Sequence, residues 1–323
     1  MLVQIIKRHG WNYLLAKIFP GILGFIAVPL FTNLYGFKNY GEIMLLIALC
    51  NMITVFSSGW LAQSWVRFQM KDLNEKNIII AIAYSIFIAS ALCLISFFIN
   101  FDNNNFSLIF ELYNYGAITL MTVGMVLYYL IVSALQALLL SKYVLKISII
   151  LSIFCLILPF ITYSFFEEPL GFIISYGIAY LISAVTGFYF FLKKNKSEVN
   201  PNKLKINDWF KYGAPISIWL SLQASIPFIE RIFIQVNLGS EFVGQFTALS
   251  ELINRGFSLL LFPITLSVQP LIIRYWNQKN KKKALKLWKE TILLMGYLFL
   301  LVTLLFYFFY DYIIIVIKNI INL

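Results

Sequence analysis

The stretch IIIAIAYSIFIASALCLISFFI, residues 78–99, contains no charged residue, and ILLMGYLFLLVTLLFYFFY, residues 292–310, has the same character near the end of the chain. An α-helix needs about 20 consecutive apolar residues to cross the hydrocarbon core of a bilayer. The strands of a membrane β-barrel would instead alternate apolar and polar residues in segments of about 10 residues. Neither stretch alternates in this way, so both predict membrane-spanning helices.

The composition of the whole chain agrees with these two stretches. Of 323 residues, 61% are hydrophobic and only 12% are charged, whereas soluble domains are roughly half apolar and a quarter charged. The sequence therefore predicts an all-α, polytopic integral membrane protein. The rule of about 20 residues per span gives about nine transmembrane helices, at residues 11–34, 41–63, 78–100, 114–138, 144–165, 170–192, 209–236, 243–267 and 289–317.

The cysteines and the histidine exclude several kinds of site. Cys50, Cys93 and Cys155 lie singly in separate apolar spans, which indicates neither a disulfide framework nor a metal site. His9 is the one histidine, so a histidine-based catalytic centre is excluded. The first apolar run is too long for a signal-peptide core and has no small-residue cleavage site, which predicts a retained first helix. We expect no cofactor, no metal and no catalytic residue.

Basic residues gather in alternate loops. The positive-inside rule assigns such loops to the cytoplasm, which predicts a cytoplasmic N-terminus. The net charge of +11 then reflects this topology together with attraction to anionic membrane lipids. Nucleic acid is not expected as a partner, because the basic residues are spread over many loops. The loops are defined by Lys7 and Arg8; Arg67, Lys71 and Lys76; Lys142 and Lys146; Lys193, Lys194, Lys196, Lys203, Lys205 and Lys211; and Arg274, Lys279, Lys281, Lys282, Lys283, Lys286 and Lys289.

A polar segment divides the chain. KKNKSEVNPNKLKIND, residues 193–208, is the longest polar stretch and follows the sixth predicted helix. We therefore predict a six-helix first half at 1–192, a cytoplasmic linker at 193–208, and a partial second half with about three helices at 209–323. The basic run at 279–289 predicts a short surface helix before the last span.

The seventh span contains two adjacent charges, in PFIERIFIQ at residues 227–235. On a helical wheel Ser217, Arg231 and Gln235 share one face, and Glu230 points about 100° away from Arg231. One helix cannot easily turn both of these directions toward lipid. We predict that Arg231 lines a buried cavity and that Glu230 faces a neighbouring helix or an ion site.

The eighth span carries a clearer polar stripe. Thr247, Glu251, Asn254, Arg255 and Ser258 fall within about 100° of arc, near the middle of the predicted span. A stripe of this kind facing lipid would cost several kcal/mol. It is therefore expected to face protein or a watery cavity.

The first span has a face suited to a bundle interior. Tyr13, Lys17, Pro20, Gly21 and Gly24 lie on one side of this helix. Small residues on such a face let neighbouring helices approach closely.

The sequence leaves structural explanations open for each charge. Glu251 and Arg255, at i and i+4, can form a neutral structural pair. Arg231 and Lys17 can extend to the membrane surfaces, and Arg67 can act as a positive-inside anchor. The convergence of cationic side chains from several helices instead favours a cationic cavity for an anionic ligand, and arginine suits phosphate in particular.

Three stretches carry a resemblance to a known family. They are YGAPISIWLSLQASIPFIERIFIQVNLGSEFVGQFTA at 212–248, KIFPGILGFIAVPLFTNLYGFKNYGE at 17–42 and WLAQSWVRFQ at 60–69. They resemble polysaccharide flippases, the Wzx-type O-antigen transporters of the multidrug/oligosaccharidyl-lipid/polysaccharide exporter superfamily. The family pattern places a Tyr-Gly-x-Pro motif, an acidic-Arg pair and a Gly-x4-Gly turn in the second half. GFKNYG at 36–41 and GSEFVG at 239–244 are two such turns, and they echo each other as in transporters built from repeats.

The chain differs from the family pattern in two respects. It implies twelve helices in a six-plus-six design, so nine predicted spans lead us to expect a chain truncated at its C-terminus or one that needs a partner. The family usually has Asp at the position of Glu230, which is a conservative change.

The resemblance implies a function that the cationic spans also suggest. The expected activity is to flip an undecaprenyl-pyrophosphate-linked oligosaccharide, an O-antigen (lipopolysaccharide) or capsule repeat unit, across the bacterial cytoplasmic (inner) membrane by alternating access. Other polysaccharide-assembly proteins are candidate partners. The alternatives are an ion-coupled small-molecule exporter of the same superfamily, and an integral-membrane polysaccharide polymerase or glycosyltransferase. The implied substrate-binding residues are Lys17, Arg67, Arg231, Asn254 and Arg255, and the implied ion-coupling residues are Glu230 and Glu251.

Overall fold

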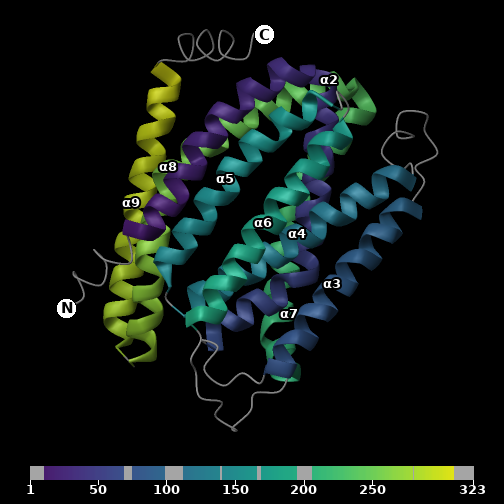
Figure 1. Cartoon of the computed structure of the whole chain (residues 1–323). Helices are drawn as coiled ribbons and strands as arrows, with labels where there is room; N and C mark the ends of the chain where they lie inside the picture. The colour runs from purple at the N-terminus through teal and green to yellow at the C-terminus, as the bar shows by residue number, and fades with distance from the viewer. Residues whose placement is uncertain are drawn as a thin grey trace. The chain divides into compact units, whose positions relative to one another are not determined.

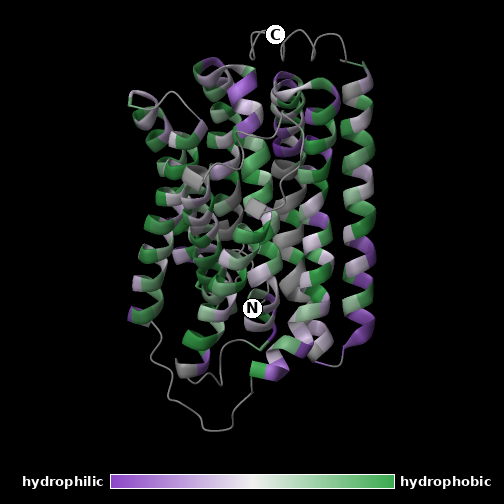
Figure 2. Ribbon diagram, turned by 90° about the vertical axis from the view of Figure 1, so that its right-hand side faces the viewer, coloured by the Kyte–Doolittle hydropathy of each residue, from purple (hydrophilic) through white to green (hydrophobic). Residues whose placement is uncertain are grey.

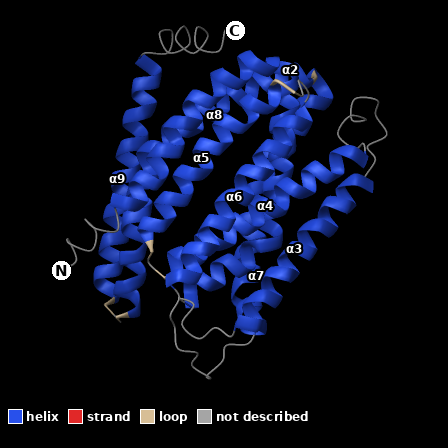
Figure 3. Cartoon of the chain, viewed as in Figure 1, coloured by secondary structure: helices blue, strands red, loops and turns tan. Residues whose placement is uncertain are grey.

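A computed structural model describes residues 11–68, 75–98, 112–138, 140–165, 169–194, 206–278 and 280–308. Every regular element within these ranges is an α-helix, which confirms the predicted all-α class (Figures 1 and 3). Hydrophobic residues cover most of the length of these helices (Figure 2). The helices are α2 (Trp11–Phe68), α3 (Glu75–Phe98), α4 (Leu112–Ala137), α5 (Ser141–Tyr163), α6 (Pro169–Lys194), α7 (Ile206–Leu238), α8 (Ser240–Asn277) and α9 (Lys281–Phe308).

Among the described residues, six helices are long and apolar enough to cross a membrane. One of them, Ile18–Phe68, has 51 residues, more than twice the length that one crossing needs. Gly36 interrupts α2 with φ 70° and ψ 163°, a backbone conformation outside the helical region that glycine adopts readily. This helix therefore accounts for the two predicted spans at 11–34 and 41–63.

Three further features refine the predicted spans. The spans predicted at 209–236 and 243–267 lie in α7 and α8, which are helical but are not among the six. Their membrane crossing stays a prediction. The separate surface helix predicted at 279–289 is wrong, because α9 begins at Lys281 and continues without a break to Phe308. The basic turns and the apolar span thus form one helix.

The chain forms two compact units, and one of them comprises Tyr35–Thr247. Within it, α4 packs on α6 through glycines, since a Cβ added at Gly124 would lie 2.9 Å from the carbonyl oxygen of Gly177. Tyr35 donates a hydrogen bond of 3.0 Å to the Pro159 carbonyl oxygen and packs edge-on against Tyr163 and Phe172. These contacts fix the residue just before the Gly36 interruption of α2 against α5 and α6.

In the same unit α7 runs antiparallel to the second segment of α2. The Ser64 hydroxyl donates to the Trp209 carbonyl oxygen at 2.6 Å, and the Ser217 hydroxyl donates to the Val55 carbonyl oxygen at 3.2 Å. The buried face of α7 is the one that the wheel predicted to be polar and interior. Its buried residues are Trp209, Gly213, Ser217, Ser221, Arg231 and Gln235.

The second compact unit comprises Met1–Leu34 and Ala248–Leu323. It contains the first segment of α2, most of α8, and α9. The rings of Phe257 on α8 and Phe299 on α9 lie 6.0 Å apart, centroid to centroid. The division of the chain into halves at 1–192 and 209–323 stays a prediction.

Candidate functional site

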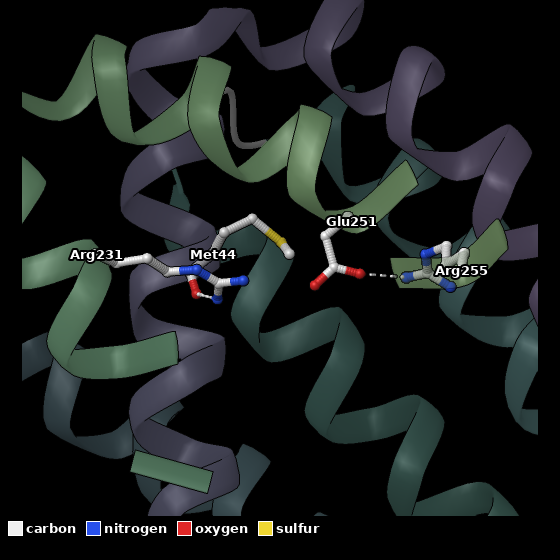
Figure 4. Close-up of polar contacts among 4 residues, drawn as sticks. All are labelled: Met44, Arg231, Glu251 and Arg255. Atoms are coloured by element: carbon white, nitrogen blue, oxygen red, sulfur yellow. Dashed lines mark hydrogen bonds and ion pairs between the residues drawn. The ribbon is translucent and has the colours of Figure 1, made fainter. Parts of the chain in front are cut away.

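Glu251 and Arg255 form an ion pair on α8 (Figure 4). The Arg255 Nη2 and Glu251 Oε2 atoms lie 3.3 Å apart, and the two side chains are 32% and 24% exposed. Partial burial strengthens an ion pair because less water screens it. The two residues lie one helical turn apart and form the i, i+4 pair that the sequence left open as a structural alternative, and their role in a ligand site stays a prediction.

The Arg255 guanidinium also packs directly on the backbone of Gly24 in the first segment of α2. A Cβ added at Gly24 would overlap the Nη1 and Cζ atoms of Arg255. The Nε atom of Arg255 is buried and has no hydrogen-bond partner within the part of the chain that the structure describes. A buried N–H without an acceptor is costly, so an oxygen atom that reached Nε after a rearrangement would satisfy it.

Arg231 has a different environment. Its side chain is 6% exposed, and its Nη1 atom donates a hydrogen bond to the Met44 carbonyl oxygen on the second segment of α2 (Figure 4). The neighbouring Gln235 is 3% exposed, and its Oε1 atom has no hydrogen-bond partner among the described residues. Arg231 therefore joins α7 to α2 at a buried position.

The remaining predicted residues occupy varied positions. Glu230 is exposed and so diverges from buried Arg231, but the described residues do not cover it, and its predicted contact with a neighbouring helix or an ion stays a prediction. Asn254 is exposed on α8. Arg67 is exposed, with its Cζ atom 6.0 Å from the centroid of the Tyr212 ring. Lys17 lies in α2, and its side chain is outside the described residues.

The two Gly-x4-Gly turns meet in the Tyr35–Thr247 unit, and they do so reciprocally. A Cβ added at Gly41 would overlap the Ser240 carbonyl oxygen, and a Cβ added at Gly244 would overlap the Phe37 carbonyl oxygen. Phe37 and Ser240 each follow the first glycine of their own turn. The second glycine of each turn therefore packs on the same carbonyl position of the other turn. The first glycines, Gly36 and Gly239, both have positive φ, 70° and 91°. Such conformations favour glycine.

Polar groups surround this junction of the two turns. The Glu42 carboxylate lies near the Lys38 ammonium and the Ser240 hydroxyl. Tyr40 is 2% exposed and Val243 is 0% exposed, so each turn also buries one large side chain. The junction joins the turns that follow the predicted spans at 11–34 and 209–236.

An apolar pocket and a metal site are two further kinds of candidate site. An apolar pocket of about 400 Å³ on α3 is lined by Ile80, Ala83, Tyr84 and Phe87, and contains none of the predicted site residues. Within the described ranges, no three His, Cys, Asp or Glu side chains gather closely enough to hold a metal ion.

Sequence reasoning missed the partners of the predicted charges. The face containing Gly24 signalled a close approach, but nothing in the sequence identified the Arg255 guanidinium as the group that approaches. Likewise, the Met44 carbonyl is a backbone acceptor with no sequence signal. The echo of the two turns was visible in the sequence, whereas their contact required the fold.

A comparison with protein families gives one match: the model of the family described as "Polysaccharide biosynthesis protein" matches residues 7–276. No curated protein and no solved structure matches the chain.

Proposed function

The chain belongs to the polysaccharide biosynthesis protein family, and from this premise we propose that it is a flippase for a lipid-linked oligosaccharide. Its substrate would be an undecaprenyl-pyrophosphate-linked repeat unit of O-antigen or capsule, moved from the cytoplasmic to the outer leaflet of the bacterial cytoplasmic membrane. The family and the multi-pass helical fold support a transport role in polysaccharide assembly. Catalytic groups have no part in this proposal.

The observation that carries the proposal is the environment of Arg255. Because Gly24 has no side chain, the Arg255 guanidinium can rest directly on its backbone. One edge pairs with Glu251, and the buried Nε atom lacks a partner among the described residues. Pyrophosphate oxygens match the donor geometry of arginine and would satisfy that atom.

Glu251 would couple the binding of a cation or proton to the binding of substrate at Arg255. A carboxylate paired with Arg255 holds the guanidinium away from the substrate, and a cation or proton on Glu251 would weaken that pair. Arg255 would then be free to bind phosphate. We assign ion coupling to Glu251, and a positioning role to Arg231, because its guanidinium is engaged with the Met44 carbonyl.

The junction of the two Gly-x4-Gly turns supports alternating access. The closest contacts at this junction are between backbone atoms of the two turns, so opening it would require the turns to separate and Tyr40 and Val243 to leave their buried positions. From the positive-inside rule we expect these turns at the outer surface. Closure of this junction would seal the outer end while the substrate site is open toward the cytoplasm.

The experiment is complementation of a bacterial strain that lacks its own flippase for a defined glycan. Wild-type protein should restore surface glycan, and Arg255→Ala should lose it at unchanged membrane abundance. The matched control is Lys142→Ala, which removes an exposed cation from α5 and should retain glycan. Normal surface glycan with Arg255→Ala would overturn the assignment of the site. If wild-type protein restored surface glycan in no strain, whichever glycan the strain makes, the proposed function would be overturned.

A further inference from the structure

The first turns of α9 carry a dense cluster of lysines. Lys281, Lys282, Lys283, Lys286 and Lys289 are all exposed and lie within the first nine residues of the helix. The uncharged apolar stretch of the same helix follows directly from residue 291. We name these five lysines the α9 lysine cluster.

This cluster conflicts with the charge preference of a helix start. The N-terminus of a helix carries partial positive charge, so acidic residues stabilise it and lysines destabilise it. The first turn of α9 contains no acidic residue. The ion pair that the cluster makes within the described residues is Lys286 with Glu290, at 3.9 Å between two well-exposed side chains. Such a pair contributes little, so among the described residues most of the cluster's positive charge is not neutralised by an acidic side chain.

The lysines also point away from the protein. On a helical wheel Lys282, Lys283, Lys286 and Lys289 fall within about 120° of arc. Ala284 is 1% exposed, and it lies on the roughly opposite side of the helix. The lysine stripe therefore faces the surroundings of the protein.

Apolar and aromatic side chains near the lysines indicate the level of the membrane at which the cluster is expected to lie. Trp276 and Trp288 are 50% and 49% exposed, as is typical of side chains at the level of lipid headgroups. The Lys281 ammonium lies 5.4 Å from the centroid of the Trp276 ring. Exposed Leu285 and Ile292 lie on the same helix. Side chains of this kind favour the boundary between headgroups and hydrocarbon, which is where we expect the lysines to lie.

We propose that the α9 lysine cluster is a binding site for anionic phospholipid, which the phosphate groups occupy while Trp288, Leu285 and Ile292 contact the acyl chains. Anionic headgroups would neutralise the lysines and the positive end of the helix together. This site is separate from Arg255 and Glu251, and it does not depend on the proposed transport function. Its role is to hold α9 at a fixed depth and to gather anionic lipid beside the protein.

The test uses full-length protein in nanodiscs of phosphatidylcholine with and without phosphatidylglycerol. The binding preference for phosphatidylglycerol over phosphatidylcholine is measured by native mass spectrometry. Replacing Lys282, Lys283, Lys286 and Lys289 by Gln should lower this preference at least about tenfold, since each lysine near a membrane surface contributes strongly. Amide hydrogen exchange of residues 281–289 should also slow in phosphatidylglycerol for the wild type, and not for this variant.

A matched control removes the same charge elsewhere. Lys142, Lys146, Lys193 and Lys211 are exposed basic residues on α5, α6 and α7, and replacing all four by Gln should leave the preference nearly unchanged. Equal losses in the two variants would overturn the proposal, because net charge alone would explain the binding. Competition by millimolar inorganic phosphate would also overturn it, because a free anion would then be the ligand. Absence of any preference in the wild type would do so directly.

Discussion

At the scale of single residues, Arg231 and Arg255 show two uses of arginine inside a membrane protein. Arg231 is almost fully buried and donates to a backbone carbonyl on another helix segment. Arg255 is partly exposed, is paired with Glu251, and keeps one buried N–H without a partner in the described part of the chain. The first environment stabilises packing, and the second is the basis of the proposed role of Arg255 in ligand binding.

We predict that Arg231 contributes to stability through its buried contact. Arg231→Ala removes the hydrogen bond and leaves a cavity, so it should lower the stability by about 2–3 kcal/mol. Arg231→Met keeps most of the volume and removes the charge, so it should remain close to the wild type. Thermal unfolding of the purified variants in detergent checks this order. A stable Arg231→Met protein that cannot transport would contradict the positioning role and favour direct contact with substrate.

At the scale of elements, glycines determine where helix segments approach. Gly213 in α7 packs so closely on the Trp60 carbonyl that an added Cβ would overlap this oxygen. Gly116 in α4 has no other atom within 4 Å of an added Cβ. The two positions therefore form a matched pair for testing the contact between α7 and α2.

The Gly213→Ala substitution should destabilise the protein, because the backbones of α7 and α2 must separate to admit a methyl group. The expected loss is about 1–3 kcal/mol, as for other overpacked sites. Gly116→Ala should be neutral or stabilising by about 0.5–1 kcal/mol, since alanine favours helix more than glycine does. Apparent melting temperatures of both variants test the difference, and equal temperatures would contradict the packing of α7 on α2.

The junction of the two turns predicts a change in accessibility. Val243→Cys, in a chain whose three cysteines are replaced by serine, should react slowly with a membrane-impermeant maleimide, because Val243 is fully buried. Adding Gly41→Ala or Gly244→Ala should raise the labelling several-fold, since a methyl group cannot fit at either glycine while the junction is closed.

Gly116→Ala is the control for that experiment and should leave the labelling slow. Rapid labelling without any glycine substitution would mean that the junction is open in the membrane. Slow labelling in the presence of Gly41→Ala would mean that the contact does not seal this end.

The elements also show what the sequence could and could not predict. The apolar runs predicted the spans in α3, α4, α5 and α6, because membrane crossing depends on composition over about 20 residues. The periodicity of α7 predicted its buried polar face. The start of α9 was predicted wrongly, since a run of lysines resembles a surface helix, whereas the structure continues it into the span. Contacts such as Arg255 with Gly24 join residues far apart in the chain, and no local pattern encodes them.

At the scale of the whole molecule, the distribution of basic residues predicts how the chain sits in the membrane. Lys38→Cys, within the first Gly-x4-Gly turn, should react with an impermeant maleimide added outside intact cells. Lys142→Cys, at the start of α5, should react only after the membrane is permeabilised. Both variants use the cysteine-free chain. The opposite pattern would reverse the predicted orientation and would place the junction of the two turns on the cytoplasmic side.

The measurement that tests the flippase proposal most directly is lipid movement by purified protein in proteoliposomes. A fluorescent undecaprenyl-pyrophosphate-linked oligosaccharide is placed in both leaflets, and a membrane-impermeant reagent that quenches it reports how fast the inner pool reaches the outer leaflet. The account predicts rapid exchange with the wild type and with Lys142→Ala, and a loss of about tenfold or more with Arg255→Ala, the expected scale for losing a charged phosphate contact. Exchange no faster than in empty liposomes, or equal rates for wild type and Arg255→Ala, would contradict it.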